Sequence, residues 1–138
     1  MTDPLMTIRE MCEAFDVTPR ALRFYEAKEL LAPIRRGTKR LYTRRDRARL
    51  TLILRGKRFG FSLEEIRQLL DLYRPGAGQA EQLSRTLEAA TRHLADMEAR
   101  RAALDAAMGD LRAQMDVLRG ELARKTGAKA LGAAASAA

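Results

Sequence analysis

Arg20 and Arg23 stand one helical turn apart in a short segment, residues 18–26, that carries its own start signal. Thr18 can cap a helix, and Pro19 suits the first helical position, where its missing N–H costs nothing. Arginine can donate two hydrogen bonds to one guanine, so a helix with two arginines on one side can read bases in a groove. The segment therefore predicts a short DNA-reading helix whose apolar residues face a core.

A helix of this length needs a supporting helix before it. Thr7 and Glu10 form the Thr-x-x-Glu pattern of a capping box, and apolar residues then recur at helical spacing, which predicts a helix over residues 8–14. Asp16 and Val17 form a turn between the two helices. The pair is typical of a helix-turn-helix, whose second helix enters the DNA major groove.

The distribution of charge agrees with a nucleic-acid partner. The chain has 26 Lys and Arg against 18 Asp and Glu, a net charge of +8 and a pI near 10.4. Residues 35–58 hold eleven basic residues and one acid, Asp46, and so carry a net charge of +10, whereas the half after Pro75 is nearly neutral. A basic block of this density predicts a polyanion, nucleic acid first and an anionic membrane surface second. The alternative is a merely solvated basic face.

A small β-hairpin is expected within the basic block, over residues 34–42. Gly37 and Thr38 give a plausible tip, with basic residues on both arms. A two-stranded hairpin is stable only where it leans on other elements, here the helices. A hairpin that follows a helix-turn-helix is called a wing.

Two further helices are predicted after the hairpin. Thr43 with Asp46, and Ser62 with Glu65, are capping patterns that precede apolar residues at helical spacing. The Pro-Gly-Ala-Gly stretch at residues 75–78 ends the second of these helices.

A long helix is predicted from Gln79 to about Arg124. Its apolar residues alternate in steps of four and three, with Arg101 as the only charged residue in the series; they are Leu83, Leu87, Ala90, Leu94, Met97, Leu104, Met108, Leu111, Met115, Leu118 and Leu122. This spacing indicates a coiled coil, and about 46 residues make a helix of roughly 70 Å. No other segment is long enough to cover it, so we expect a second copy of the chain; the alternative is a long helix packed on its own domain.

These elements predict an all-α fold with a small β-hairpin wing. Residues 1–75 form a winged helix-turn-helix domain, residues 76–124 a linker and dimerisation helix, and residues 125–138 a disordered tail.

Other kinds of chemistry have weak support in the sequence. Cys12 is the only cysteine, which excludes an intramolecular disulfide, and we expect it to pack as a small hydrophobe. His93 has no second ligand at metal spacing and is expected at the surface or beside the seam. No paired carboxylates, Ser/His/Asp set or glycine-rich phosphate loop stands out. We therefore expect no enzyme, metal or cofactor, and, without a signal peptide or membrane span, a cytoplasmic protein.

The chain resembles the MerR family of bacterial transcriptional regulators over residues 7–72. The residues that carry the resemblance are Thr7-Ile8-Arg9-Glu10, Val17-Thr18-Pro19-Arg20-Ala21-Leu22-Arg23-Phe24-Tyr25-Glu26, Leu30-Leu31-x-Pro33, Arg40-Leu41-Tyr42 and Gly60-Phe61-Ser62-Leu63-Glu64-Glu65-Ile66. The resemblance implies a homodimer joined by an antiparallel coiled coil. It also implies that the dimer binds a palindromic promoter operator. The dimer bends and untwists this DNA so that RNA polymerase can use the promoter, or it simply represses transcription.

The resemblance implies roles for individual residues. Thr18, Arg20 and Arg23 would contact the DNA groove, and Tyr25 would contact the DNA backbone. Phe24 meets a base methyl or lies in the core. Wing contacts are Arg36, Lys39, Arg40 and Tyr42, and weaker phosphate candidates are Arg44 and Lys57. The wing departs from the family pattern Gly-Tyr-Arg, because Thr38 and Lys39 precede Arg40.

The same comparison bears on what the protein senses. Metal and redox members of the family carry cysteines near both ends of the dimerisation helix, where this chain has none, and drug-binding members carry a C-terminal domain for which this tail is too short. The chain is weakly similar to regulators of branched-chain amino-acid and acyl-CoA breakdown. If the protein has a small-molecule effector, its identity is unknown and it is expected to bind between the coiled coil and the DNA-binding domain, near residues 72–94. The rival hypothesis is a DNA-organising coiled-coil protein with little sequence preference.

Overall fold

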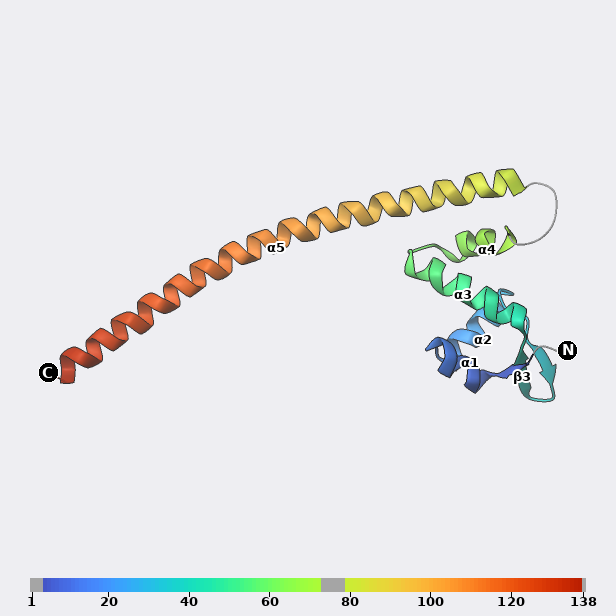
Figure 1. The fold of residues 1–138 in the computed structure, drawn as a ribbon, viewed down its shortest axis with the longest axis horizontal. Helices are drawn as coiled ribbons and strands as arrows, with labels where there is room; N and C mark the ends of the chain where they lie inside the picture. The colour runs from blue at the N-terminus through green and yellow to red at the C-terminus, as the bar shows by residue number, and fades with distance from the viewer. Residues whose placement is uncertain (1–3, 73–78, 138) are drawn as a thin grey trace. The chain divides into compact units, whose positions relative to one another are not determined.

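The computed structural model describes residues 4–72 and 79–137, with side chains as far as residue 127. Two short helices lie near the N-terminus. They are α1 (Ile8–Phe15) and α2 (Pro19–Ala27), and Figure 1 shows them as adjacent elements at the blue end of the chain. The predicted capping box is present, since Glu10 donates its N–H to Thr7 Oγ1 at 3.2 Å and accepts from the Thr7 N–H at 3.1 Å. Thr18 caps α2 by accepting from the Ala21 N–H at 3.1 Å. The predicted helix-turn-helix is therefore confirmed.

A three-stranded antiparallel sheet follows, with strand order β1-β3-β2. It consists of β1 (Met6–Thr7), β2 (Ile34–Arg36) and β3 (Lys39–Tyr42). The hairpin β2–β3 and its tip are as predicted, and Gly37 at the tip has φ 61°, a left-handed conformation that favours glycine. The sequence did not predict β1, which pairs Met6 with Tyr42 and Thr7 with Leu41 and so ties the hairpin to the start of α1.

Two capped helices follow the sheet: α3 (Arg44–Arg58) and α4 (Leu63–Asp71). Asp46 is 3% exposed and accepts from the N–H groups of Thr43 at 3.0 Å and Ala32 at 3.1 Å, so one carboxylate serves both a helix start and the preceding loop. The core beneath these elements consists of Met11, Leu22, Tyr25, Leu30, Leu31, Tyr42, Leu50, Ile53, Ile66 and Leu70. Cys12 packs against this core, as expected, and burial raises the pKa of its thiol.

The long helix is α5 (Gln79–Ala137). It continues beyond Arg124, the predicted end, through a segment rich in alanine, the residue with the highest helix propensity. The predicted break at residues 75–78 lies outside the described residues. Among the described residues, no helix offers an apolar stretch that could cross a bilayer.

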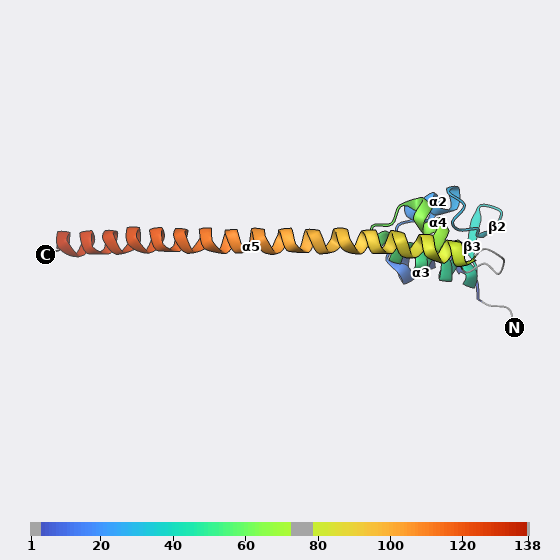
Figure 2. The ribbon, with the colours of Figure 1, turned by 90° about the horizontal axis from the view of Figure 1, so that it is seen from above.

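The chain divides into two units, Met1–His93 and Leu94–Ala138. The first unit includes the first turns of α5, which lie beside α4 in both Figure 1 and Figure 2 and bury Ala89 to 3% exposure. In the second unit the described residues belong to α5 alone. Its apolar residues at coiled-coil spacing are exposed, among them Leu104 (61%) and Leu111 (60%).

Candidate nucleic-acid interface

Helix α2 buries Leu22 and Tyr25 in the core and exposes its two arginines. Leu22 is fully buried and Tyr25 is 4% exposed, whereas Arg20 and Arg23 are both exposed, as is the capping residue Thr18. The helical period explains the division, because residues three apart share a face. The structure thus leaves two arginines on the outer side of a helix that is anchored in the core.

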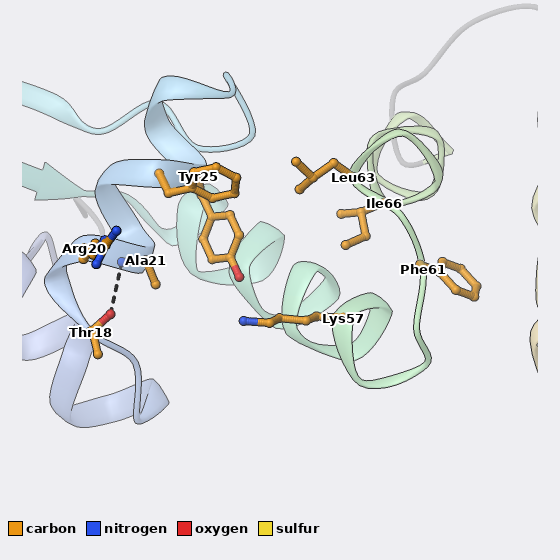
Figure 3. A pocket seen from close by; sticks show the side chains of 9 residues that line it. Thr18, Arg20, Ala21, Tyr25, Lys57, Phe61, Leu63 and Ile66 are labelled. Carbon is orange, nitrogen blue, oxygen red and sulfur yellow. Dashed lines mark hydrogen bonds between the residues drawn. The ribbon is translucent and has the colours of Figure 1, made fainter. Parts of the chain in front are cut away.

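A groove of about 510 Å³ runs along one side of α2 (Figure 3). Its lining brings together Thr18, Arg20, Phe24, Tyr25 and Lys57, five of the residues singled out from the sequence, with apolar side chains from the beginning of α4. Figure 3 shows the Lys57 side chain reaching from α3 toward the side of α2 that carries the Tyr25 hydroxyl. A cation and a hydroxyl that line the same groove are suited to a phosphate or another anion.

The sequence analysis left two positions open for Phe24, one at the surface against a base methyl and one in the core. Its side chain is 44% exposed, so it lies at the surface and not in the core. The ring packs edge-on to Tyr25, with centroids 5.8 Å apart, and Lys28 Nζ lies 5.8 Å from the ring centroid. An exposed aromatic ring next to Arg20 can contact the methyl group of a thymine.

A second, smaller hollow of about 220 Å³ lies between α2 and the wing. It is lined by Arg23, Thr38, Lys39 and Arg40 together with residues at the start of α1. The hairpin therefore brings two basic wing residues next to one of the exposed arginines of α2. Arg36 is exposed at the end of β2.

Glu26, to which the sequence analysis assigned no role, connects the wing to α2. Its Oε1 accepts from Arg35 Nη2 at 2.7 Å and Nε at 3.1 Å, and its Oε2 accepts from Arg40 Nε at 2.6 Å. Partial burial raises the pKa of Glu26, but hydrogen bonds from Arg40 and Arg35 outweigh it and hold the pKa below its usual value. The signal in the sequence was the single acid of α2, nine residues before the basic block at residues 35–58.

Tyr42 is not available for the wing contact that we expected. It is fully buried, and its hydroxyl has no hydrogen-bond partner among the described residues. The reason is register: β3 pairs with β1 so that Tyr42 lies opposite Met6, and alternation along the strand turns the ring into the core. Burial accordingly raises the pKa of Tyr42.

Part of the basic block supports the fold and not a ligand. Arg47 Nη1 donates to the Pro4 carbonyl at 3.0 Å, and Arg49 Nε donates to the Leu30 carbonyl at 2.7 Å. Arg44 is exposed in the first turn of α3, and Lys57 in its last turn. Net charge thus overstates the number of side chains that can bind phosphate, since some satisfy backbone carbonyls.

The part of the chain that the structure describes holds no group of three or more His, Cys, Asp and Glu residues that could bind a metal. A polar groove of about 470 Å³ lies between α4 and the first turns of α5, with Glu64, Gln68, Arg85 and Glu88 in its lining. Its lining residues on α5 lie within residues 72–94, the region that the sequence analysis names for an effector, whereas those at and before α4 do not.

Comparisons with known proteins agree with this geometry. The family model "MerR HTH family regulatory protein" matches residues 6–72, and the model "MerR, DNA binding" matches residues 47–123. The HTH-type transcriptional regulator CueR of Salmonella typhi is 33% identical over 102 residues, covering 70% of this chain and 74% of CueR.

Two solved structures are similar along most of the chain. A MerR-family transcriptional regulator from Bacillus cereus has a TM-score of 0.61 and 31% identity, over 78% of this chain and 79% of that one. HiNmlR, a MerR-family regulator lacking the sensor domain and bound to promoter DNA, has a TM-score of 0.55 and 26% identity, over 94% and 96% of the two chains. The similarity thus extends to a protein that was solved on DNA.

Proposed function

The chain belongs to the MerR family of DNA-binding transcriptional regulators, and we propose that it acts as a homodimer on a palindromic promoter operator, which it distorts to activate or repress transcription. The observation that carries this proposal is the placement of α2. Its exposed residue Arg20 lines the groove that also contains Lys57, and its exposed residue Arg23 lines the hollow next to the basic wing. Base contacts flanked by phosphate contacts are the arrangement that sequence-specific recognition needs.

Residue roles follow from this placement. Arg20 and Arg23 read bases, with Phe24 against a thymine methyl. Contacts to the sugar-phosphate backbone fall to Thr18, Tyr25, Arg36, Lys39, Arg44 and Lys57. Arg40 and Tyr42 leave the set of direct contacts, because the first is bound by Glu26 and the second is buried.

The homodimer is supported by α5. In the unit Leu94–Ala138 the described apolar residues at coiled-coil spacing are exposed, and a second copy of the same helix would bury them. Two copies present two α2 helices to two half-sites, which is why we propose a palindromic operator. Backbone contacts on both half-sites supply the binding energy for bending the DNA between them.

The remaining partners belong to the same proposal. A regulator that realigns a promoter works with RNA polymerase, in the cytoplasm of a bacterium. We place a small-molecule effector in the polar groove between α4 and the start of α5, because a ligand there would touch both elements.

Selection from a library of random duplex DNA tests the proposal. We expect the protein to enrich a palindromic sequence and to bind it about 10³-fold or more tightly than random DNA at physiological salt. Equal affinity for selected and random DNA would contradict the proposal and favour the DNA-organising alternative. End-to-end fluorescence energy transfer on the selected duplex tests the distortion, since a bend brings the two dyes closer.

Two variants separate reading from backbone binding within the same groove. Arg20→Ala should lower the preference for the selected sequence, by roughly 10- to 100-fold. Lys57→Ala should weaken binding to both DNAs alike and reduce the dependence on salt by about one phosphate contact. An unchanged preference in Arg20→Ala would mean that another residue reads the bases.

A further inference from the structure

Glu26 is an acidic residue within the surface that we propose binds DNA, where a negative charge is unexpected. It lies in the last turn of α2, one turn beyond Arg23, and each of its carboxylate oxygens accepts hydrogen bonds from a different wing arginine. Arg35 comes from β2 and Arg40 from β3, so one side chain of α2 holds both strands of the hairpin. The Glu26 side chain is only 19% exposed and that of Arg40 only 22%, which makes the Glu26–Arg40 pair a partly buried contact.

The contact has a mechanical and an electrostatic consequence. A two-stranded hairpin has little stability of its own, so its orientation depends on the elements that hold it, here β1 and Glu26. The carboxylate also offsets one of the two positive charges on Arg35 and Arg40. It thereby weakens the attraction that these two residues exert on any phosphate, whatever the DNA sequence.

We propose that Glu26 is a positioning residue for DNA recognition, which fixes the wing relative to α2 and reduces the sequence-independent attraction of Arg35 and Arg40 for phosphate. The inference rests on the proposed function. It assigns Arg40 a role through Glu26 and not through DNA. When the distance between the wing and α2 is fixed, the protein binds best to DNA on which both can make their contacts at once. The fixed distance therefore raises the preference for the selected sequence over random DNA.

The central test compares Glu26→Gln with Glu13→Gln, on random DNA and on the sequence that the wild-type protein selects. Both variants remove one negative charge, but Glu13 lies on α1, where its side chain is 71% exposed and 3.4 Å from Arg9. For Glu26→Gln we expect tighter binding to random DNA, a salt dependence steeper by about one phosphate contact, and roughly a tenfold loss of preference. Glu13→Gln should leave the preference and the slope unchanged. Equal behaviour of the two variants would overturn the inference.

If Glu26→Gln unfolds, which circular dichroism would show, Arg40→Lys keeps the test decisive. If Glu26→Gln folds, a double-mutant cycle adds a second test. Arg40→Lys retains the charge but not the guanidinium Nε–H that binds Glu26, so we expect lower preference with an unchanged salt slope. In a double-mutant cycle, Glu26→Gln with Arg40→Gln should lose no more preference than either single variant, because the two residues act through one contact. Losses that multiply would show that Arg40 contacts DNA directly and would contradict its assigned role.

Failure of the proposed function and failure of the proposed role of Glu26 give different results. If the wild-type protein enriches no sequence, the proposed function is wrong, while the salt slopes on random DNA still test the electrostatic effect of Glu26. If the wild-type protein discriminates and Glu26→Gln does so equally well with the same slope, only the inference about Glu26 is wrong.

Discussion

His93 Nε2 lies 3.0 Å from Oε1 and 3.2 Å from Oε2 of Glu65, a contact that joins the first turns of α5 to the N-terminal turn of α4. The imidazole also stacks on Phe61, with ring centroids 5.0 Å apart. Glu65 meanwhile accepts from the Ser62 N–H at 2.8 Å as part of the α4 capping box. One carboxylate therefore both takes part in the cap that starts α4 and binds a side chain of α5.

The Glu65 contacts predict a loss of stability in acid. The backbone N–H of Ser62 is the main cause that lowers the pKa of Glu65; burial opposes it, hydrogen bonding to His93 adds to it, and the result is a pKa of about 2 against an ordinary 4.5. Because the folded-state pKa is the lower one, the ionised form favours folding. The ionised Glu65 carboxylate contributes about 1–2 kcal/mol to the free energy of unfolding. This contribution is present above about pH 4.5 and is lost as the pH falls toward 2.

Urea denaturation between pH 6 and pH 3 measures this loss. The free energy of unfolding should fall more steeply in the wild-type protein than in Glu65→Gln, which has no carboxylate to titrate. Glu64→Gln is the matched control, since Glu64 lies on the same turn with its side chain 72% exposed. Identical pH profiles for wild type and Glu65→Gln would contradict the prediction.

Tyr42 and Tyr25 should respond differently to the loss of a hydroxyl group. The Tyr42 hydroxyl is buried without a hydrogen-bond partner among the described residues, so Tyr42→Phe should leave DNA affinity unchanged and stability equal or higher by up to about 1 kcal/mol. Tyr25 lines the groove beside Lys57, and Tyr25→Phe should weaken DNA binding by roughly 3- to 10-fold. Thermal melts and binding isotherms check both; weaker binding by Tyr42→Phe would return Tyr42 to the interface.

The starts of the helices were predictable because their signals are local. Thr7, Thr18, Thr43 and Ser62 each cap the helix that follows, and each acts on a backbone N–H three residues away. The same holds for the hairpin tip at Gly37. The outward position of Arg20 also follows from helical periodicity within a single short segment.

The features that sequence reasoning missed are contacts between distant segments. The burial of Tyr42 depends on β1, a strand of two residues with no recognisable pattern of its own. The pairing of Glu26 with Arg40 and that of Glu65 with His93 join residues 14 and 28 positions apart. Such contacts depend on how the elements pack, and a pattern read along a single element does not contain that information.

Gly56 is predicted to be intolerant of a methyl group. It is buried within α3, and a Cβ there would lie 2.8 Å from Cγ1 of Ile66 on α4. Ile66 is 3% exposed and has little room to move, so Gly56→Ala should destabilise the fold by about 1–3 kcal/mol. Gly120→Ala is the control: its Cβ would meet nothing within 4 Å, and it should stabilise α5 by about 1 kcal/mol. Thermal denaturation followed by circular dichroism distinguishes the two; a neutral Gly56→Ala would show that α4 can shift away from α3.

The proposed dimer seam is tested by placing a charge on it and beside it. Leu111 is 60% exposed and belongs to the alternating apolar series, whereas Val117 is 57% exposed and lies outside that series. Leu111→Glu puts a carboxylate into the seam, where it would be buried without a partner, so the dimer should dissociate. Val117→Glu adds the same charge to the solvent-facing side and should leave the dimer intact.

Light scattering over a range of protein concentrations gives the oligomeric state of each variant. We expect wild type and Val117→Glu to have twice the mass of the chain, and Leu111→Glu to have the mass of one chain at the same concentrations. Because one subunit can occupy only one half-site, Leu111→Glu should also bind the selected operator at least about 100-fold more weakly, an effect that Val117→Glu should not share. A dimeric Leu111→Glu would show that the alternating series is not the seam. Dissociation of both variants would instead indicate that more of the α5 surface is buried between the subunits than a two-helix seam requires.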